Sequence, residues 1–338
     1  MKLLVILPVS IQDNIKHWKR SLARQGLHGS TWLIRHLPYP LVEWLTRFFI
    51  AVGFLFVVRQ KRIARESLNI AFGREKDPQE IERISRECFK NLGKGMMELM
   101  YFMEHPRMIG ERTFFEGKEN LDEALKGGRG VIGVSAHFGN FPLMLLRLAQ
   151  DGYKTNAIIR PTRDQKVEEY FQGLRSRQGL NTIYSHPRQQ CVNTAISVLR
   201  NNEFLFIPLD QNFGSAGGVY VDFFGQKAAT ATGPVIFALR TKAPILPIFV
   251  VRQPNDHHKI IIEPPLQLQE AGDDKETIVL NTTRITQVIE RYIRQYPQEW
   301  GWMHRRWKSR PAGENDNSVI LASQPSLREG KGAGEEAL

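Results

Sequence analysis

His137 stands in a segment whose residue types suit proton transfer. The segment reads Ser-Ala-His-Phe-Gly-Asn-Phe-Pro over 135–142 and follows a short apolar run at 130–135. A neutral imidazole in such a place can take the proton of an attacking hydroxyl. Gly139 permits close backbone approach, and a helix that starts after it would offer N–H groups to an anion. From spacing alone, a structural histidine at a strand end is the alternative.

Asp210 follows a second apolar run, 204–209. Parallel strands end at one edge of a sheet, so we expect Asp210 at the same edge as His137. The alternative is that Asp210 caps a turn. Further on, Phe223 and Phe224 precede Gly225, and these rings either line an apolar channel or pack in the core.

Three arginines are candidates for binding a phosphate or a developing oxyanion. Arg160 ends a predicted strand, and Arg175 and Arg177 lie on or after a predicted helix. The guanidinium carries a fixed fork of donors that matches such oxygens. A solvated helix-face charge is the alternative for each of them.

Tryptophans and cations alternate towards the end of the chain. Residues 299–311 read Glu-Trp-Gly-Trp-Met-His-Arg-Arg-Trp-Lys-Ser-Arg-Pro. This pattern is typical of a surface at the level of lipid headgroups or of a sugar-phosphate contact. Some of the tryptophans are expected to pack in the core instead.

The elements that must position these residues alternate along the chain. Predicted strands lie at 130–135, 155–159, 181–184, 204–209, 245–251 and 259–262. Predicted helices lie at 141–150, 166–178, 192–200, 234–241 and 280–295, after a long scaffold helix at 78–104. Such alternation predicts an α/β fold whose central sheet has helices on both faces.

The amino-terminal part is basic and apolar. Its first 66 residues hold eleven Lys or Arg against three Asp or Glu, in a chain of net charge +11. The run 41–58 is interrupted only by Glu43 and Arg47, and it falls short of the about 20 apolar residues that a spanning helix needs. We therefore favour a helix lying in the inner leaflet, with a single span or a buried core helix as alternatives. The cations after residue 58 indicate that this end faces the cytoplasm.

Composition limits the remaining possibilities. The basic excess favours an anionic partner, and a membrane is preferred to nucleic acid because no zinc-finger or RNA-recognition signature is present. Cys88 and Cys191 are far apart without a CxxC motif, which indicates buried thiols rather than a metal or redox site. We expect a membrane-associating helical segment at 1–70, a catalytic domain at 71–311 and a disordered tail at 312–338.

Together these motifs resemble those of the lipid A biosynthesis (lauroyl/myristoyl) acyltransferases, a branch of the glycerolipid acyltransferase fold group. The resemblance runs from about residue 30 to 311. The shared pieces are ARESLNIAFG at 64–73, HFGNF at 137–141, IIRP at 158–161, RSRQG at 175–179, DQNFG at 210–214, VDFFG at 221–225, TATG at 230–233, APILP at 243–247 and WGWMHRRWKSRP at 300–311.

The resemblance implies a mixed central sheet and an acyl transfer at the cytoplasmic face of the inner membrane. The donor would be acyl carrier protein, and the acceptor would be a hydroxyl of an anionic lipid A precursor in lipopolysaccharide biosynthesis. It implies no metal and no organic cofactor. By motif position, His137 is the catalytic base, Asp210 a second acid and Arg175 the essential arginine. The expected substrate contacts are Arg160, Asn140, Gln211, Phe224, Arg305 and Arg306.

One position departs from the family pattern. The family motif is H-x-x-x-x-E or H-x-x-x-x-D, whose carboxylate orients the histidine, whereas this chain has Pro142 there. Asp151 is too far along to replace it, while a proline suits the first turn of a helix. We therefore predict that Asp210 stands in, with its side chain within hydrogen-bond or one-water reach of His137.

Two alternative functions stay open at this point. One is acylation of another (lyso)glycolipid or phospholipid acceptor. The other is a catalytically weak lipid-binding relative, which the proline at position 142 suggests.

Overall fold

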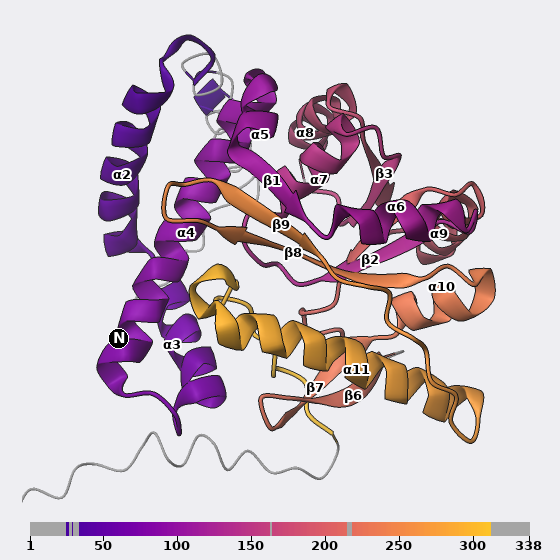
Figure 1. Cartoon of the computed structure of the whole chain (residues 1–338). Coiled ribbons are helices and arrows are strands. Elements are labelled where there is room, and N and C mark those ends of the chain that lie inside the picture. The colour runs from indigo at the N-terminus through magenta and orange to yellow at the C-terminus, as the bar shows by residue number, and fades with distance from the viewer. Residues whose placement is uncertain (1–24, 27–28, 30–33, 163, 215–217, 312–338) are drawn as a thin grey trace, which may run out of the picture.

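The computed structural model describes residues 25–26, 29, 34–162, 164–214 and 218–311. The tail predicted at 312–338 and the first 24 residues lie outside this part. The described chain forms an α/β structure in which helices flank a central mixed sheet (Figure 1), as predicted.

Among the described residues, the central sheet has seven strands in the order β1-β9-β8-β2-β5-β3-β4. Their bounds are β1 Thr113–Glu116, β2 Val131–Ser135, β3 Thr155–Ile159, β4 Leu180–Tyr184, β5 Phe204–Pro208, β8 Ile245–Arg252 and β9 His258–Ile262. The five strands from β8 to β4 are parallel, and β9 pairs antiparallel with β8. The carboxyl ends of β2, β5 and β3 therefore meet at one edge, where an open α/β sheet places its ligands.

Two hydrophobic cores cover the two faces of this sheet. Successive side chains of a strand point to opposite faces. Accordingly Leu205 and Ile207 of β5 join one core, while Phe204 and Phe206 join the other. The first core is completed by α3 (Val58–Phe72), α9 (Arg188–Arg200), α10 (Gly233–Thr241) and α11 (Asp274–Gln295). The second contains α5 (Arg107–Arg112), α6 (Lys118–Lys126), α7 (Phe141–Gln150) and α8 (Gln165–Arg177).

The helix α4 (Pro78–Glu104) contributes to both cores, as its predicted scaffold role requires. Asp77 caps it by accepting a hydrogen bond from the backbone N–H of Glu80 at 2.8 Å, and Pro78 occupies the first turn. The helix α11 starts six residues before its predicted position. Asp273 caps the helix at that point, whereas the apolar periodicity that predicts the start of the helix begins at residue 280.

Sequence patterns missed the hairpin β6 (Gly218–Phe223) and β7 (Gln226–Ala231). Its two-residue turn is Phe224-Gly225, with φ of 54° and 70°. This is the left-handed pair that a type I′ turn requires, a place usually taken by Asn-Gly. Because Phe224 takes the first of these two positions, the sequence lacks the Asn-Gly pair by which such a turn is usually recognised.

The apolar amino-terminal run forms α2 (Tyr39–Phe56), which lies along the outside of α4 (Figure 1). Within the described residues it is the one helix long and apolar enough to cross a membrane, yet only 11% of it is buried inside the protein. The buried-core alternative is therefore wrong for α2. The next helix differs, because Leu68 and Phe72 of α3 are buried, and the predicted domain boundary at residue 70 falls inside it.

Candidate active site

His137 and Asp210 meet at the carboxyl edge of the sheet. Ser135 at the end of β2 pairs in register with Pro208 at the end of β5, so both residues lie two positions beyond matched strand ends. His137 Nδ1–H donates to Asp210 Oδ1 at 2.7 Å. The predicted contact between the two side chains is therefore present. A carboxylate is only an acceptor, so the neutral imidazole carries its proton on Nδ1 and has its basic lone pair on Nε2.

The carboxylate of Asp210 is fully buried and uses both oxygens. Its Oδ2 accepts a hydrogen bond at 2.8 Å from the indole Nε1–H of Trp300, whose ring is itself fully buried. An ionised carboxylate away from water is tolerated only with such partners. Trp300 thus fixes the acid, and the acid fixes the imidazole, whose side chain remains 28% exposed.

The pKa values of the two groups move in opposite directions. Burial alone would lower the pKa of His137, but the charge of Asp210 and the hydrogen bond to it outweigh burial and raise that pKa above its ordinary 6.5. Burial likewise opposes ionisation of Asp210, yet the charge of His137 and the hydrogen bonds from His137 and Trp300 hold the pKa of Asp210 well below its usual range. Both shifts favour a charged carboxylate beside a basic imidazole.

Backbone N–H groups next to His137 are already used. Phe138 N–H donates to the carbonyl of Ala136 and Gly139 N–H donates to that of Glu299, each at 2.8 Å. Gly139 has φ +55°, and an added Cβ would lie 2.1 Å from the carbonyl oxygen of Val250. This glycine is therefore needed for packing against β8, rather than for approach to a ligand as predicted.

Asn140 positions the site from within the protein, which differs from its predicted role as a substrate contact. It is 6% exposed and caps α7, its Oδ1 accepting from Leu143 N–H. Its amide donates to Gly95 and, at 3.3 Å, to Glu98. All these partners are internal, so no group is left over for a ligand.

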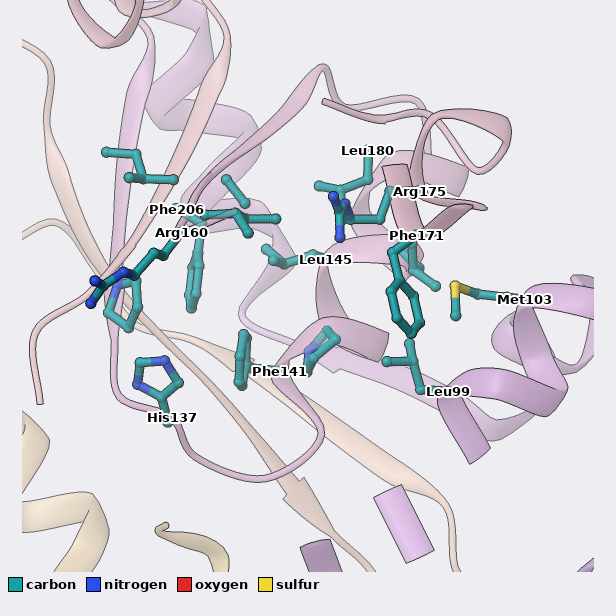
Figure 2. Close-up of a pocket in the computed structure, with 16 residues that line it drawn as sticks. Leu99, Met103, His137, Phe141, Leu145, Arg160, Phe171, Arg175, Leu180 and Phe206 are labelled. Carbon is teal, nitrogen blue, oxygen red and sulfur yellow. The ribbon is translucent and has the colours of Figure 1, made fainter. Parts of the chain in front are cut away.

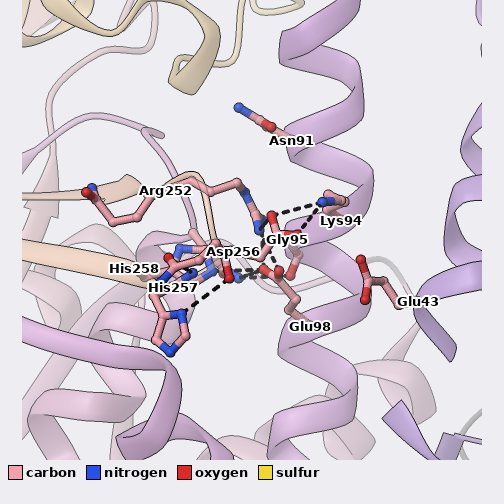
Figure 3. A network of polar contacts seen from close by, with 12 residues as sticks. Glu43, Asn91, Lys94, Gly95, Glu98, Arg252, Asp256, His257 and His258 are labelled. Atoms are coloured by element: carbon pink, nitrogen blue, oxygen red, sulfur yellow. Dashed lines mark hydrogen bonds and ion pairs between the residues drawn. The ribbon is translucent and has the colours of Figure 1, made fainter. Parts of the chain in front are cut away.

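Glu98 is the centre of a buried ionic network behind this loop (Figure 3). It forms a bidentate pair with Arg252 at 2.5 and 2.7 Å and accepts from His258 at 3.0 Å. Asp256 extends the network to Lys94 at 2.7 Å. The network ties α4 to the β8–β9 hairpin and, through Asn140, to the start of α7. No sequence signal assigned these residues, because they are isolated charges in separate elements.

A pocket of about 280 Å³ opens beside His137. Thirteen of its sixteen lining residues are apolar, among them Phe141, Leu145, Phe206, Leu99 and Phe171. Figure 2 shows His137 and Arg160 at one end, and Arg175 at the other with Phe171 and Leu180. An apolar pocket with a few polar groups at its end suits a ligand with a long apolar part.

The pocket separates Arg160 from Arg175, two of the three candidate arginines. Arg175 Nε–H donates to Thr182 Oγ1 at 3.0 Å, and Arg175 Nη2–H donates to Glu168 at 2.6 Å. Thr182 lies on β4, three strands from β2, or roughly 14 Å across the sheet. Arg175 is thus brought to the pocket but not to His137.

Two further side chains stand at the imidazole. The side-chain amide of Gln211, a predicted substrate contact, lies 3.2 Å from Nε2 of His137. The ring of His304 lies 5.4 Å from that of His137, and burial together with the charge of His137 lowers the pKa of His304. His304 lies in the motif at 300–311 without a predicted role, because the cations and tryptophans around it are typical of a surface.

Phe224 and Arg306 lie in the core, which differs from their predicted substrate contacts. Phe224 packs with Phe72 and Trp302, away from the pocket. Arg306 is fully buried and donates to Ala229 and Thr230. Their neighbours Trp300, Trp302 and Trp307 are also buried, so these tryptophans form a packed cluster rather than a headgroup surface. Arg305 remains exposed.

Pro142, which stands where the family pattern has a carboxylate, takes the place at the start of a helix that the sequence predicts for it. Pro142 lies in the first turn of α7 and lines the pocket. Asp151 pairs with Lys118 and Arg147 at the other end of that helix.

Cys88 is buried, and burial raises its pKa to about 12, which suits an inert thiol. The expectation of a reaction without metal or cofactor stays a prediction.

Comparison with known proteins places these features in a family. The family model described as bacterial lipid A biosynthesis acyltransferase matches residues 16–309. The lipid A biosynthesis palmitoleoyltransferase of Escherichia coli is 26% identical over 85% of this chain and 91% of its own. The lipid A biosynthesis lauroyltransferase of the same organism is 27% identical over 84% and 91%. Among solved structures, the 1-acyl-sn-glycerophosphate acyltransferase of Thermotoga maritima gives a TM-score of 0.34 at 14% identity, covering 70% of this chain and 97% of that one. That score is too low to establish a shared fold.

We predict that Asp210→Asn lowers the pKa of His137. The substitution removes the negative charge that raises this pKa, while burial, which lowers it, remains. The fall can be measured by NMR titration of histidine labelled at Cε1, with the His137→Gln variant for assignment. Asp151→Asn, a paired carboxylate elsewhere, is the control and should leave the value unchanged. An unaltered His137 titration in Asp210→Asn would contradict the electrostatic coupling.

Proposed function

Because this chain belongs to the family of bacterial lipid A biosynthesis acyltransferases, we propose that it transfers a fatty acyl chain from an acyl carrier protein thioester to a hydroxyl of a lipid A precursor. The observation that supports this best is the His137–Asp210 pair at the end of an apolar pocket. A base and a lipid-sized pocket are the two things that acyl transfer to a hydroxyl requires.

The reaction follows from the protonation states of the pair. Nε2 of His137 takes the proton of the acceptor hydroxyl as its oxygen attacks the thioester carbonyl. The buried charge of Asp210 stabilises the imidazolium that forms and keeps the proton of Nδ1 in place. When the tetrahedral intermediate collapses, the carbon–sulfur bond breaks and the imidazolium returns its proton to the leaving thiolate. The carboxylate at Asp210 thus does the work that the family pattern gives to the position of Pro142.

The acyl chain of the donor would occupy the pocket. Its carbonyl would lie beside His137 and its methyl end towards Leu99, Met103 and Phe171. Each methylene that leaves water for such a surface contributes about 0.8 kcal/mol, so a pocket of fixed depth discriminates between chain lengths.

The acceptor and the donor would reach the site from the cytoplasmic face of the inner membrane. The outward face of α2 exposes large apolar side chains, among them Phe49, Leu55 and Phe56. The exposed cations Arg59, Arg62 and Arg65 follow directly on α3. An apolar helix face beside cations matches a bilayer with anionic lipids and an anionic acceptor.

We predict that His137→Ala reduces acyl transfer by about 10²–10⁴ while the fold persists, because it removes the general base. The test is mass spectrometry of lipid A from a deletion strain complemented with wild type or variant, together with turnover of purified acyl carrier protein thioester. His257→Ala, a half-buried histidine in the loop between β8 and β9, is the control and should keep wild-type turnover. Near-normal transfer by folded His137→Ala would refute the base. Lipid A unchanged by deletion, with a different lipid losing an acyl chain, would instead identify another acceptor.

We also predict that Phe171→Ala shifts the transferred chains to longer lengths and Leu145→Phe shifts them to shorter lengths. The first substitution deepens the pocket and the second fills it. Discrimination should change by about fourfold per methylene. Competition between carrier-bound donors of different length gives the ratio, and the same chain distribution in both variants would contradict the proposed acyl site.

For membrane attachment, we predict that a triple variant with Phe49, Leu55 and Phe56 changed to serine moves from the membrane pellet to the soluble fraction. These side chains are 64%, 67% and 79% exposed, so the fold should lose little stability. Phe114→Ser, 44% exposed on β1, is the matched control and should stay with the membrane. Retention of the triple variant in the pellet would exclude α2 as the attachment surface.

A further inference from the structure

Glu168 connects the far end of the pocket to the segment that carries Arg160. It lies in the first turn of α8 and is 6% exposed. One of its oxygens accepts from Arg175 at 2.6 Å, and the other accepts from the backbone N–H of Thr162 at 2.7 Å. Burial opposes the ionised form, but the hydrogen bond from Thr162 and the pairing with Arg175 lower the pKa of Glu168. The carboxylate is thus held charged between two elements.

Through Thr162 this contact holds the backbone that bears Arg160. Only Pro161 lies between the two residues, and its ring fixes φ. An anchored Thr162 N–H therefore restricts where the segment after β3 can place Arg160. By register, Ile159 is level with Pro208 and Ser135, so Arg160 lies at the sheet edge where His137 and Asp210 meet.

Arg160 is a cation at this edge whose guanidinium is not already used within the described part of the protein. It makes no hydrogen bond or ion pair with any of the described residues, and it lines the pocket end where His137 stands (Figure 2). The N–H groups of Phe138 and Gly139 are occupied by carbonyls and cannot serve a developing oxyanion. Arg175 is fixed to Glu168 and Thr182, three strands away from β2.

We propose that Arg160 is the cation that stabilises the oxyanion, and that Arg175 is a positioning residue that acts on Arg160 through Glu168 and Thr162. This inference rests on the proposed acyl transfer. In the tetrahedral intermediate the carbonyl oxygen becomes negative, and the guanidinium of Arg160 donates hydrogen bonds to it until the thiolate leaves. Arg175 touches no reacting atom, and its loss acts by leaving the buried carboxylate of Glu168 without a cationic partner.

A double-mutant cycle tests the shared pathway, using purified protein and carrier thioester. Arg160→Ala should lower kcat by about 10²–10³, the cost of one oxyanion donor, with little change in KM. Arg175→Met should cause a similar loss in the wild-type background. In the Arg160→Ala background, Arg175→Met should lower kcat by less than about a further threefold, because both residues act through Arg160. If the two residues acted independently, their losses in kcat would multiply. Lys166→Met, on the exposed side of the same helix, is the matched control.

A suppressor separates positioning from misfolding. Glu168→Gln should restore part of the kcat that Arg175→Met loses, since a neutral amide needs no cation while its carbonyl still accepts from Thr162 N–H. Thermal unfolding of each variant shows whether it is folded. Multiplicative losses in the cycle, or no recovery in Arg175→Met/Glu168→Gln, would overturn the proposal by giving Arg175 a direct role. A wild-type protein without acyl transfer would instead refute the proposed function itself.

Discussion

A buried negative charge governs the arrangement of this site. The carboxylate of Asp210 has no contact with water, and an ion in that position must find its partners within the protein. His137 supplies one from β2, and Trp300 supplies the other from the end of the described chain. The surrounding packing serves these two contacts, because the ring of Trp300 is held between Phe223, Trp302 and Trp307. The aromatic cluster is therefore a support for the acid, although its composition resembles a lipid-facing surface.

A second set of constraints holds the histidine from behind. The close contact between Gly139 and Val250 fixes the loop against β8, and Asn140 joins the loop to Glu98 on α4. Buried ion pairs contribute little net stability, but removal of one partner is costly. The network around Glu98 thus fixes α4, the β8–β9 hairpin and the start of α7 in one relative arrangement. The general-base role proposed for His137 needs rigid support of this kind, because the efficiency of a base depends on geometry.

Much of the fold could be predicted from the sequence, because strand ends and helix periods are local signals. The strands at 155–159 and 204–209, and with them the sheet edge that joins His137 to Asp210, followed from apolar runs. The partners made by distant segments could not be predicted. Nothing local distinguishes Trp300 as a hydrogen-bond donor to Asp210, or Arg306 as a core residue rather than a phosphate ligand. The same limit applies to Arg175, whose motif position indicated importance but whose contacts decide how it acts.

The contact between Trp300 and Asp210 also sets an order of events. These residues are 90 positions apart, and the tryptophan belongs to the last segment of the described chain to leave the ribosome. A chain that ends before Trp300 contains His137 and Asp210, but its Asp210 lacks the donor on Oδ2. The site therefore becomes complete only once synthesis has passed the aromatic cluster. Acyl transfer as proposed for this site would therefore require that the chain has been made and packed as far as the aromatic cluster.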